Sequence, residues 1–124
     1  MTYQIIYNNT QHYLHAKVTG ENSPQVVKQY LSEILQKCIQ DHHQYVLIEE
    51  QLDGPRLDTL EVFDVASEKS EQSMGVFKAI AYVDVNAIND EMMRFAETVA
   101  VNRSLPARVF STVAEAEQWL QSKF

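Results

Sequence analysis

Two short apolar runs place the tightest limit on how this chain can fold. They are Tyr45–Ile48 (YVLI) and Val76–Val83 (VFKAIAYV). Each has the length of a strand, and neither alternates strictly between apolar and polar positions. Continuous apolar strands are typical of parallel sheets, in which both faces of the strand are covered. The two runs therefore predict central parallel strands in an α/β protein.

The segments around the first run carry helix signals, as connections between parallel strands require. Ser23–Pro24 has the residue types of an N-cap and a first helical position, and the apolar spacing that follows predicts a helix to about Asp41. Asp58–Glu61 has the spacing of a capping box. It predicts a second helix over residues 59–67, with an irregular polar segment over residues 67–73.

The last third of the chain predicts helix, strand and helix. The helix that contains Phe95 and Val99 is expected to end at Asn102, a residue type that tolerates the left-handed conformation. Residues 106–110 predict a short strand. Thr112–Glu115 has the spacing of a second capping box and opens a helix with a buried apolar face. The residues of that face are Val113, Ala116, Trp119 and Leu120.

The N-terminal segment predicts an antiparallel hairpin. Tyr3–Tyr7 and His12–Thr19 are β-rich runs on either side of a polar turn. The predicted order is therefore β-β-α-β-α-β-α-β-α, a five-stranded mixed sheet that is parallel except for the hairpin, in one domain of residues 1–124. The open edge of the first strand favours a homodimer, with Tyr3, Ile5 and Tyr7 helping to pair two copies.

Charge and composition exclude several classes of function. The net charge is −7, and Glu49–Glu71 holds eight acidic residues against Arg56 and Lys69, a balance of −6. No basic stripe is present, which argues against nucleic-acid binding. No apolar run approaches the roughly 20 residues of a membrane helix, and the N-terminus lacks signal-peptide features. With Cys38 interpreted as a buried small hydrophobe, we expect a cytoplasmic protein without membrane insertion.

The end of the first apolar run is the most site-like part of the sequence. In open α/β sheets, ligands bind beyond the carboxyl ends of the strands. We expect a loop there that either forms an acidic rim for a basic protein partner or a cation, or is simply solvated and caps a helix. The candidate partner-binding residues of this loop are Glu49, Glu50, Asp53, Arg56 and Asp58.

Groupings that support catalysis or metal binding are not suggested by the sequence pattern. His12 and His15 would point to opposite faces of one strand, and the adjacent His42 and His43 would also diverge. The chain has no cysteine pair, no His-x-x-x-His on a helix and no Ser–His or Cys–His pairing by position. Its three glycines exclude the familiar phosphate loops. We therefore expect no metal, no cofactor and no enzymatic activity.

The last third of the chain also resembles a family signature. Residues 95–120 (FAETVAVNRSLPARVFSTVAEAEQWL) are similar to the closing segment of small bacterial proteins of the STAS/SpoIIAA-like superfamily, which is also grouped with Sec14-like domains. These proteins close with a helix like F-x-E-x-V-A-x-N-R-G, a strand like V-R-V-F and a helix ending in E-A-x-x-W-L. The order of the predicted elements matches too, so the resemblance spans nearly the whole chain and implies the same fold. The matching residues are Phe95, Glu97, Val99, Ala100, Asn102, Arg103, Arg108, Val109, Phe110, Glu115, Ala116, Trp119 and Leu120.

The resemblance implies a non-enzymatic interaction or regulatory module that binds a protein partner. Anti-sigma-factor antagonists of this superfamily bind a kinase and are switched by phosphorylation of a Ser in an Asp-Ser-Ser-Gly stretch. That stretch starts the helix after the central strand, a position occupied here by Asp58–Glu61. Thr59 is therefore the candidate switch hydroxyl. The second Ser and the Gly are absent, and acidic residues flank Thr59 on both sides, although a helix N-terminus favours a phosphate.

The Sec14-like side of the resemblance implies an alternative, the binding of a small apolar, lipid-like ligand. Methionine and aromatic side chains would line such a pocket, but the same residues at helical spacing are typical of an ordinary core. The sequence leaves both interpretations open. The candidate lining residues are Phe63, Met74, Phe77, Met92 and Met93.

Overall fold

The computed structural model describes residues 3–54, 57–73, 75–84 and 91–124 and, within these ranges, all side chains except those of Thr59, Met92 and Met93. The elements of the described part follow the predicted order. They are β1 (Tyr3–Asn9), β2 (Leu14–Glu21), α1 (Pro24–Asp41), β3 (Tyr45–Asp53), α2 (Thr59–Gln72), β4 (Ala79–Asp84), α3 (Glu91–Asn102), β5 (Ala107–Phe110) and α4 (Val113–Gln121).

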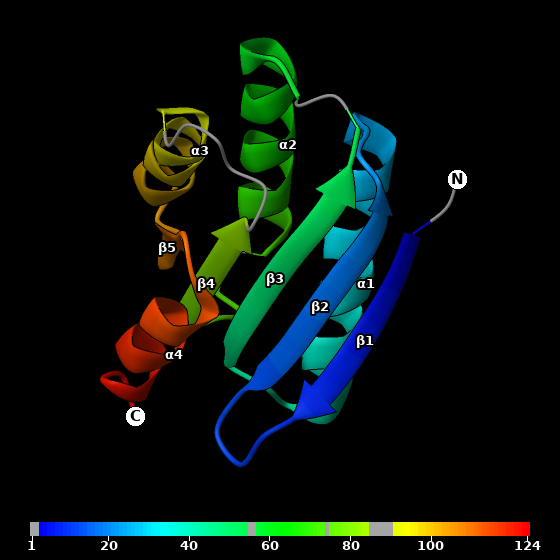
Figure 1. Ribbon diagram of the computed structural model, residues 1–124. Coiled ribbons are helices and arrows are strands. Elements are labelled where there is room, and N and C mark those ends of the chain that lie inside the picture. The colour runs from blue at the N-terminus through cyan, green and yellow to red at the C-terminus, as the bar shows by residue number, and fades with distance from the viewer. Residues whose placement is uncertain (1–2, 55–56, 74, 85–90) are drawn as a thin grey trace.

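The strands form one mixed sheet in the order β1-β2-β3-β4-β5 (Figure 1). β1 pairs antiparallel with β2, and every later neighbour is parallel. The predicted α/β class, the edge hairpin and the parallel remainder are confirmed.

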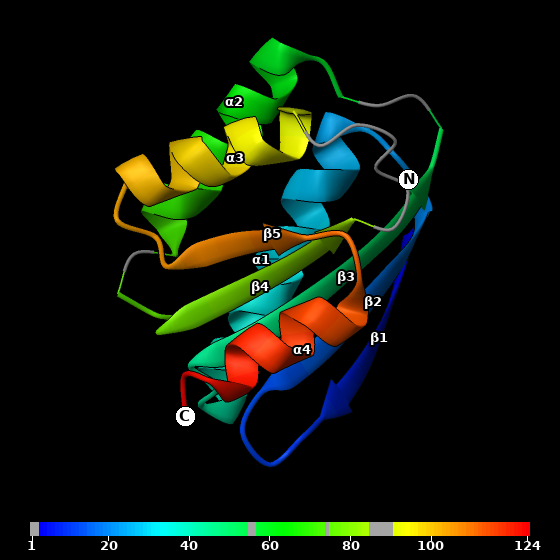
Figure 2. The same ribbon diagram turned by 60° about the vertical axis from the view of Figure 1, so that its left-hand side comes forward.

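The strand order explains where the helices lie. Each of α1, α2 and α3 connects a strand to its parallel neighbour on the same side, and such crossovers are right-handed. Successive crossovers that proceed in one direction across a sheet put their helices on one face. α1, α2 and α3 accordingly cover one face, whereas α4 alone packs on the other (Figure 2).

Each face has its own apolar core. On the face of α1 and α2, side chains of β2, β3 and β4 pack against α1, and Leu14 and Ile34 are almost completely buried. On the opposite face, Leu47 and Leu120 form the centre of a smaller core under α4. The alternation of inward and outward side chains along β2 and β3 decides which core each residue joins.

The predicted helix starts are confirmed. Ser23 Oγ accepts a hydrogen bond from the Val26 amide at 3.1 Å. Asp58 and Glu61 form the reciprocal capping box, with both side chain–backbone hydrogen bonds at 2.9 Å. Thr112 caps α4 by accepting from the Glu115 amide at 3.3 Å, and its hydroxyl donates to the Glu115 carboxylate at 3.0 Å. This bond between the two side chains replaces the reciprocal bond of the predicted second capping box, in which the Glu115 side chain would accept from the Thr112 backbone amide.

Three predicted boundaries are wrong by three residues or more, whereas those of the hairpin strands differ by two. β3 does not end at Ile48, because its pairing with β2 continues to Asp53. α2 continues through the segment predicted as irregular and ends at Gln72, where Lys69 Nζ contacts Ser32 of α1 and Gln72 at 2.6 and 2.9 Å. β4 begins at Ala79 instead of Val76. For β3 and α2, these tertiary contacts outweigh the local pattern.

The predicted left-handed end of α3 is displaced by two residues. Asn102 is the last helical residue, and Ser104 takes the left-handed conformation with φ of 64°. The amide of Leu105 then donates to the carbonyl of Ala100 at 3.0 Å, which closes the helix end. Ser104 occupies the position of the glycine in the N-R-G signature, so this positive φ explains why glycine suits that position.

Candidate functional site

The acidic residues at the end of β3 point to opposite faces of the sheet. Glu49 lies on the face of α4, where its carboxylate contacts His15 Nε2 at 2.9 Å and accepts from Gln51 Nε2 at 2.6 Å. Glu50 lies on the other face and is only 6% exposed. The prediction that both residues belong to a loop is wrong, since they are strand residues and successive strand side chains alternate.

The other residues predicted for the rim lie in separate places. Asp53 is the exposed last residue of β3, and its carbonyl accepts from the Asn22 amide at 2.7 Å. Asp58 caps α2, and Thr59 is the first residue of that helix. Arg56 lies outside the described residues, as does the side chain of Thr59. The described acidic residues therefore do not converge on one rim.

Glu50 instead forms a buried cluster with two tyrosines, which we call the Glu50 cluster. The hydroxyls of Tyr30 on α1 and Tyr82 on β4 both donate to Glu50 Oε2, and the two hydroxyl oxygens are 2.5 Å apart. Tyr30 is completely buried. Glu50 is also aligned with the buried Asp84 across the β3–β4 ladder. Hydrogen bonds to buried carboxylates are strong, so this cluster joins α1, β3 and β4.

The environment of Tyr30 strongly favours its neutral form. Burial raises the pKa of the Tyr30 hydroxyl well above its ordinary value of 10.0, and the charges of Glu50 and Asp84 raise it further. An ionised phenolate at this position would lie in an apolar core beside acidic groups. Tyr30 therefore remains a hydrogen-bond donor to Glu50 throughout the physiological pH range.

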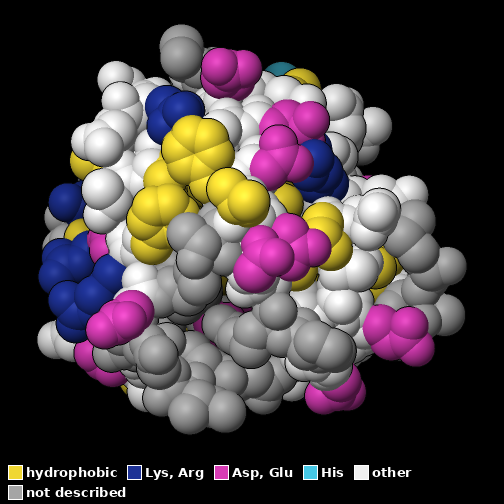
Figure 3. Space-filling model, turned by 90° about the horizontal axis from the view of Figure 1, so that it is seen from above, with side chains coloured by type: hydrophobic (Ala, Val, Ile, Leu, Met, Phe, Trp, Pro, Cys, Tyr) yellow, Lys and Arg dark blue, Asp and Glu magenta, His cyan; other side chains and the backbone are white. Residues whose placement is uncertain are grey.

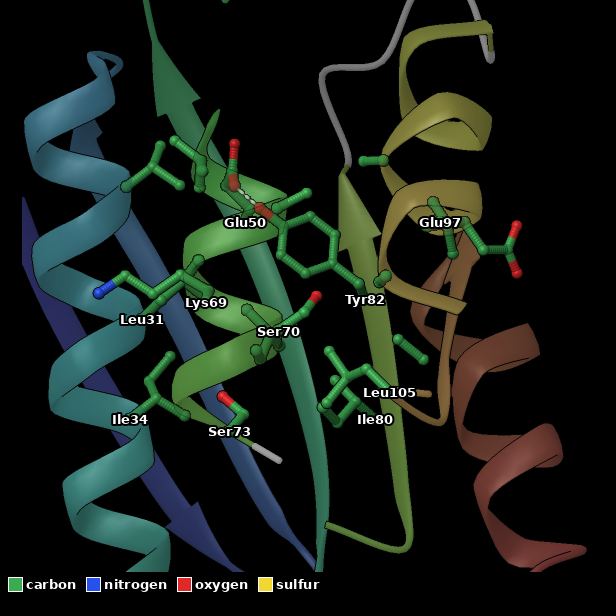
Figure 4. A pocket seen from close by; sticks show the side chains of 18 of the residues that line it. Leu31, Ile34, Glu50, Lys69, Ser70, Ser73, Ile80, Tyr82, Glu97 and Leu105 are labelled. Atoms are coloured by element: carbon green, nitrogen blue, oxygen red, sulfur yellow. Dashed lines mark hydrogen bonds between the residues drawn. The ribbon is translucent and has the colours of Figure 1, made fainter. Parts of the chain in front are cut away.

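The Glu50 cluster lies at the edge of an apolar cavity of about 180 Å³, which we call the inner cavity (Figure 4). α2 packs against α1 and α3, and the inner cavity separates α2 from the sheet. Its walls are mostly apolar. The polar lining residues lie at the ends of β3 and β4 and along α2, together with Asn22 before α1 and Glu97 on α3. Among the lining residues are Leu31, Ile34, Val65, Ile80, Ala100 and Leu105.

One polar side chain of the inner cavity lacks a partner. Ser70 is 1% exposed, and its Oγ makes no hydrogen bond among the described residues. Figure 4 shows this hydroxyl pointing from α2 toward the side of Tyr82. An unsatisfied buried hydroxyl costs about 1–3 kcal/mol. A hydrogen-bonding partner for the Ser70 hydroxyl would therefore stabilise the folded protein.

The residues predicted to line a ligand pocket agree with the inner cavity only in part. Phe77 lines it. Phe63 does not, because α2 directs Val62, Val65 and Ser70 inward and leaves Phe63 44% exposed. Met74 and the side chains of Met92 and Met93 lie outside the described residues.

A second feature lies on the surface at the carboxyl ends of the parallel strands. Leu60 is 80% exposed and lies one helical turn before Phe63, whose ring stacks with Phe95 of α3 at a centroid distance of 6.5 Å. The guanidinium of Arg103 lies 5.4 Å from the centre of the Phe63 ring. We call Leu60, Phe63 and Phe95 the carboxyl-end patch. Figure 3 looks onto this end of the molecule and shows hydrophobic side chains gathered beside acidic ones.

Other candidate groups are accounted for by the fold. Cys38 is fully buried on α1, and burial raises the pKa of its thiol to about 12, which makes it unreactive. Within the described ranges, no group of three or more His, Cys, Asp and Glu side chains is arranged to hold a metal. None of the helices in the described part of the chain has the length and hydrophobicity needed to cross a bilayer.

The fold is shared with known structures. An anti-sigma factor antagonist from Mycobacterium paratuberculosis aligns with a TM-score of 0.59 and 11% identity, over 97% of this chain and 95% of its own. An uncharacterized protein of the DUF3478 family with a SpoIIAA-like fold, from Shewanella loihica, aligns with a TM-score of 0.54 and 20% identity, over 95% and 93%. At sequence identities of 11% and 20%, the similarity to these two structures shows a shared fold and nothing about function.

Comparison with curated proteins gives no match. The sequence model of the SpoIIAA-like family matches residues 13–121, which is most of the chain and includes both the parallel strands and the C-terminal signature. This match agrees with the resemblance seen in residues 95–120. The chain belongs to the SpoIIAA-like family.

Proposed function

We propose that this chain is a non-enzymatic regulatory module of the STAS type, which binds a protein partner in the bacterial cytoplasm through the carboxyl-end patch. The observation that carries the proposal is the exposure of Leu60 and Phe63 on the first two turns of α2. Exposed apolar side chains that gather at one place and are bordered by charged residues are typical of protein interfaces.

The charge around the patch indicates the chemistry of the partner. Asp58, Glu61 and Asp64 lie on the same turns of α2 as the patch. Asp64 already pairs with Lys28 at 2.7 Å, whereas the contacts of the Asp58 and Glu61 carboxylates within the described residues are those of the capping box. A partner that presents an apolar side chain beside lysine or arginine fits this surface, and we expect its binding to weaken at high salt.

The likeness to an anti-sigma factor antagonist supports a regulatory role of this kind. Thr59 is the first residue of α2 and adjoins the exposed Leu60, so a phosphate there would lie within the proposed interface. The N-terminus of α2 would favour the phosphate, and the carboxylates of Asp58 and Glu61 would oppose it. Phosphorylation of Thr59 stays a prediction, as does the role of Glu49, Glu50, Asp53 and Arg56 in binding.

The homodimer also stays a prediction. Tyr3, Ile5 and Tyr7 pack toward the core on the face of α1, and the Tyr3 hydroxyl donates to Glu33. These side chains therefore do not project from the sheet edge as a pairing surface. Ile6, which is 58% exposed, is the large apolar side chain that β1 leaves open to a second copy. Light scattering of the purified protein measures the oligomeric state directly.

The partner proposal predicts a specific crosslinking pattern. A photoreactive phenylalanine derivative at position 60 or 63 should crosslink the same protein in the native host, because both side chains belong to one exposed patch. The purified partner should then bind the wild-type chain, and Leu60→Asp should weaken its binding at least 30-fold, the loss expected of an interface hot spot. Calorimetry measures both affinities.

Ala114→Asp is the matched control, since Ala114 is exposed on α4 at the opposite face of the sheet. It should leave the affinity unchanged. Crosslinks that differ between positions 60 and 63, or a partner that binds Leu60→Asp as tightly as the wild type, would contradict the proposal.

A further inference from the structure

We propose that the inner cavity is a binding site for one small, neutral ring compound that carries a hydroxyl or amine donor. The site goes beyond the proposed docking of a protein partner and rests on different residues. The carboxyl-end patch lies on the outer surface of α2 and α3, whereas the inner cavity lies between these helices, α1 and the sheet.

The volume limits the size of the ligand. Apolar cavities of about 150 Å³ stay dry and bind a single aromatic ring such as benzene. The inner cavity, at about 180 Å³, is slightly larger and accommodates one ring or a fused pair of rings. A diacyl lipid is far too large for this volume. The Sec14-like resemblance implies a small apolar ligand, and this volume restricts such a ligand to one ring or a fused pair of rings.

The walls favour an apolar body. α1 contributes Leu31 and Ile34, β4 contributes Ile80, and Leu105 and Ala100 close the side of α3 and β5. A water molecule needs two to four polar partners to be held in a cavity. Most of this surface offers none, so an apolar ligand gains contacts there that water cannot replace.

The polar end of the inner cavity favours a ligand group that donates hydrogen bonds and disfavours an anionic ligand. Glu50 and Asp84 line the cavity at the carboxyl ends of β3 and β4, where their side-chain oxygens can accept hydrogen bonds. Lys69 is the lining residue with a positive charge, but its ammonium already contacts Ser32, Gln72 and Glu68. A ligand carboxylate would therefore lie near the acidic groups of Glu50 and Asp84, and no described lining residue directs a positive charge at it.

Ser70 supplies the second and independent sign of a ligand. Its hydroxyl is buried, has no hydrogen-bond partner among the described residues and points into the cavity (Figure 4). Native proteins rarely leave such groups unsatisfied, and an exception calls for an unseen partner. A ligand hydroxyl or amine placed between Ser70 and Tyr82 would form the missing hydrogen bond with the Ser70 hydroxyl. The ring of the same ligand would fill the apolar part of the cavity.

Indole is a suitable probe because it is neutral, has two fused rings and carries one N–H donor. We expect calorimetry to show that the purified full-length chain binds indole, and that octanoate at pH 7 does not bind. Ser70→Ala should weaken indole binding about tenfold, since it removes the hydroxyl and adds no atoms to the cavity wall. Ala100→Leu and Ala66→Leu fill the cavity from two different walls, and each should reduce binding below detection.

Ala114→Leu adds the same side chain on the exposed face of α4 and should leave indole binding unchanged. Circular dichroism shows which of the two cavity-filling variants remain folded. If one of them does not fold, the other still provides the test. Absence of indole binding to the wild-type chain at the solubility limit of indole would overturn the proposal. Unchanged binding by a folded filling variant, or tighter binding of octanoate than of indole, would overturn it as well. Because Leu60 and Phe63 lie outside the cavity, none of these results bears on the protein partner.

Discussion

Tyr30→Phe is expected to lower the free energy of unfolding by about 2–3 kcal/mol. The substitution keeps the buried ring and removes only the hydroxyl that donates to Glu50. Hydrogen bonds to charged groups contribute about 1.5–3 kcal/mol, and a buried carboxylate that loses a donor is left partly unsatisfied. Urea denaturation of the two proteins, followed by circular dichroism, measures the difference.

Two comparisons isolate the role of the hydrogen bond. Tyr45→Phe removes a hydroxyl that donates a long hydrogen bond, 3.4 Å, to the carbonyl of Lys123 near the surface, and it should cost less than about 0.5 kcal/mol. In a Glu50→Leu background the cost of Tyr30→Phe should fall below about 1 kcal/mol, because the acceptor is gone. Equal losses for Tyr30→Phe with and without Glu50 would show that the Glu50 cluster does not hold the hydroxyl.

Ionisation of Cys38 and Tyr30 on unfolding is expected to contribute about 3 kcal/mol of destabilisation between pH 9 and pH 11. Burial raises the pKa of Cys38 from 9.0 to about 12, and burial with the charges of Glu50 and Asp84 raises the pKa of Tyr30 well above 10.0. The unfolded chain therefore releases these protons at lower pH than the folded chain. Stability is fully present below pH 9 and falls as the pH rises, with a slope of about 1.4 kcal/mol per pH unit for each group that ionises only on unfolding.

The contributions of Cys38 and Tyr30 can be separated by the pH at which each begins to lower the stability. Tyr30→Phe should reduce the slope by about 1.4 kcal/mol per pH unit above pH 10, and Cys38→Ala should remove the part that begins near pH 9. Chemical denaturation at a series of pH values measures these slopes. Stability that stays constant up to pH 11, or a slope that Tyr30→Phe leaves unchanged, would be inconsistent with a buried neutral Tyr30.

The order of the elements could be predicted because each signal is local. The apolar runs indicated parallel strands, and the serine, aspartate and threonine caps placed the starts of α1, α2 and α4 where the structure has them. The ends of elements were less predictable. β3 continues through Glu49 and Glu50 because β2 pairs with it, and the polar end of α2 is held by its contact with α1. These contacts join residues distant in sequence.

The placement of Glu50 was accessible from the sequence but was missed. Val46, Ile48, Glu50 and Leu52 repeat with the period of two that marks one strand face, and three of them are apolar. Extending the strand through the first charged residue would have placed Glu50 in the core. Its partners could not be predicted in this way, since Tyr30 and Tyr82 lie 20 and 32 residues away and meet Glu50 only through the sheet order.

The inner cavity was not predictable from local pattern at all. It exists because α2 rests on α1 and α3 and stands away from the sheet, a matter of how three helices pack together. The sequence suggested methionine and phenylalanine as the lining of a pocket. Of these, Phe77 does line the cavity, and among the described residues the rest of the lining consists mainly of aliphatic side chains and the polar groups of residues such as Ser70, Tyr82 and Glu50.

Carbon-13 NMR of the tyrosines tests most directly whether the Glu50 cluster and the inner cavity form one site. The protein is labelled at Cζ, the ring carbon that bears the hydroxyl, and the signals of Tyr82 and Tyr45 are assigned with the corresponding phenylalanine variants. Addition of indole should shift the signal of Tyr82, which lines the cavity, and leave that of Tyr45 in place, since Tyr45 lies on the face of α4. A Tyr82 signal that does not move at saturating indole, or an equal shift at Tyr45, would contradict a ligand site at the Glu50 cluster.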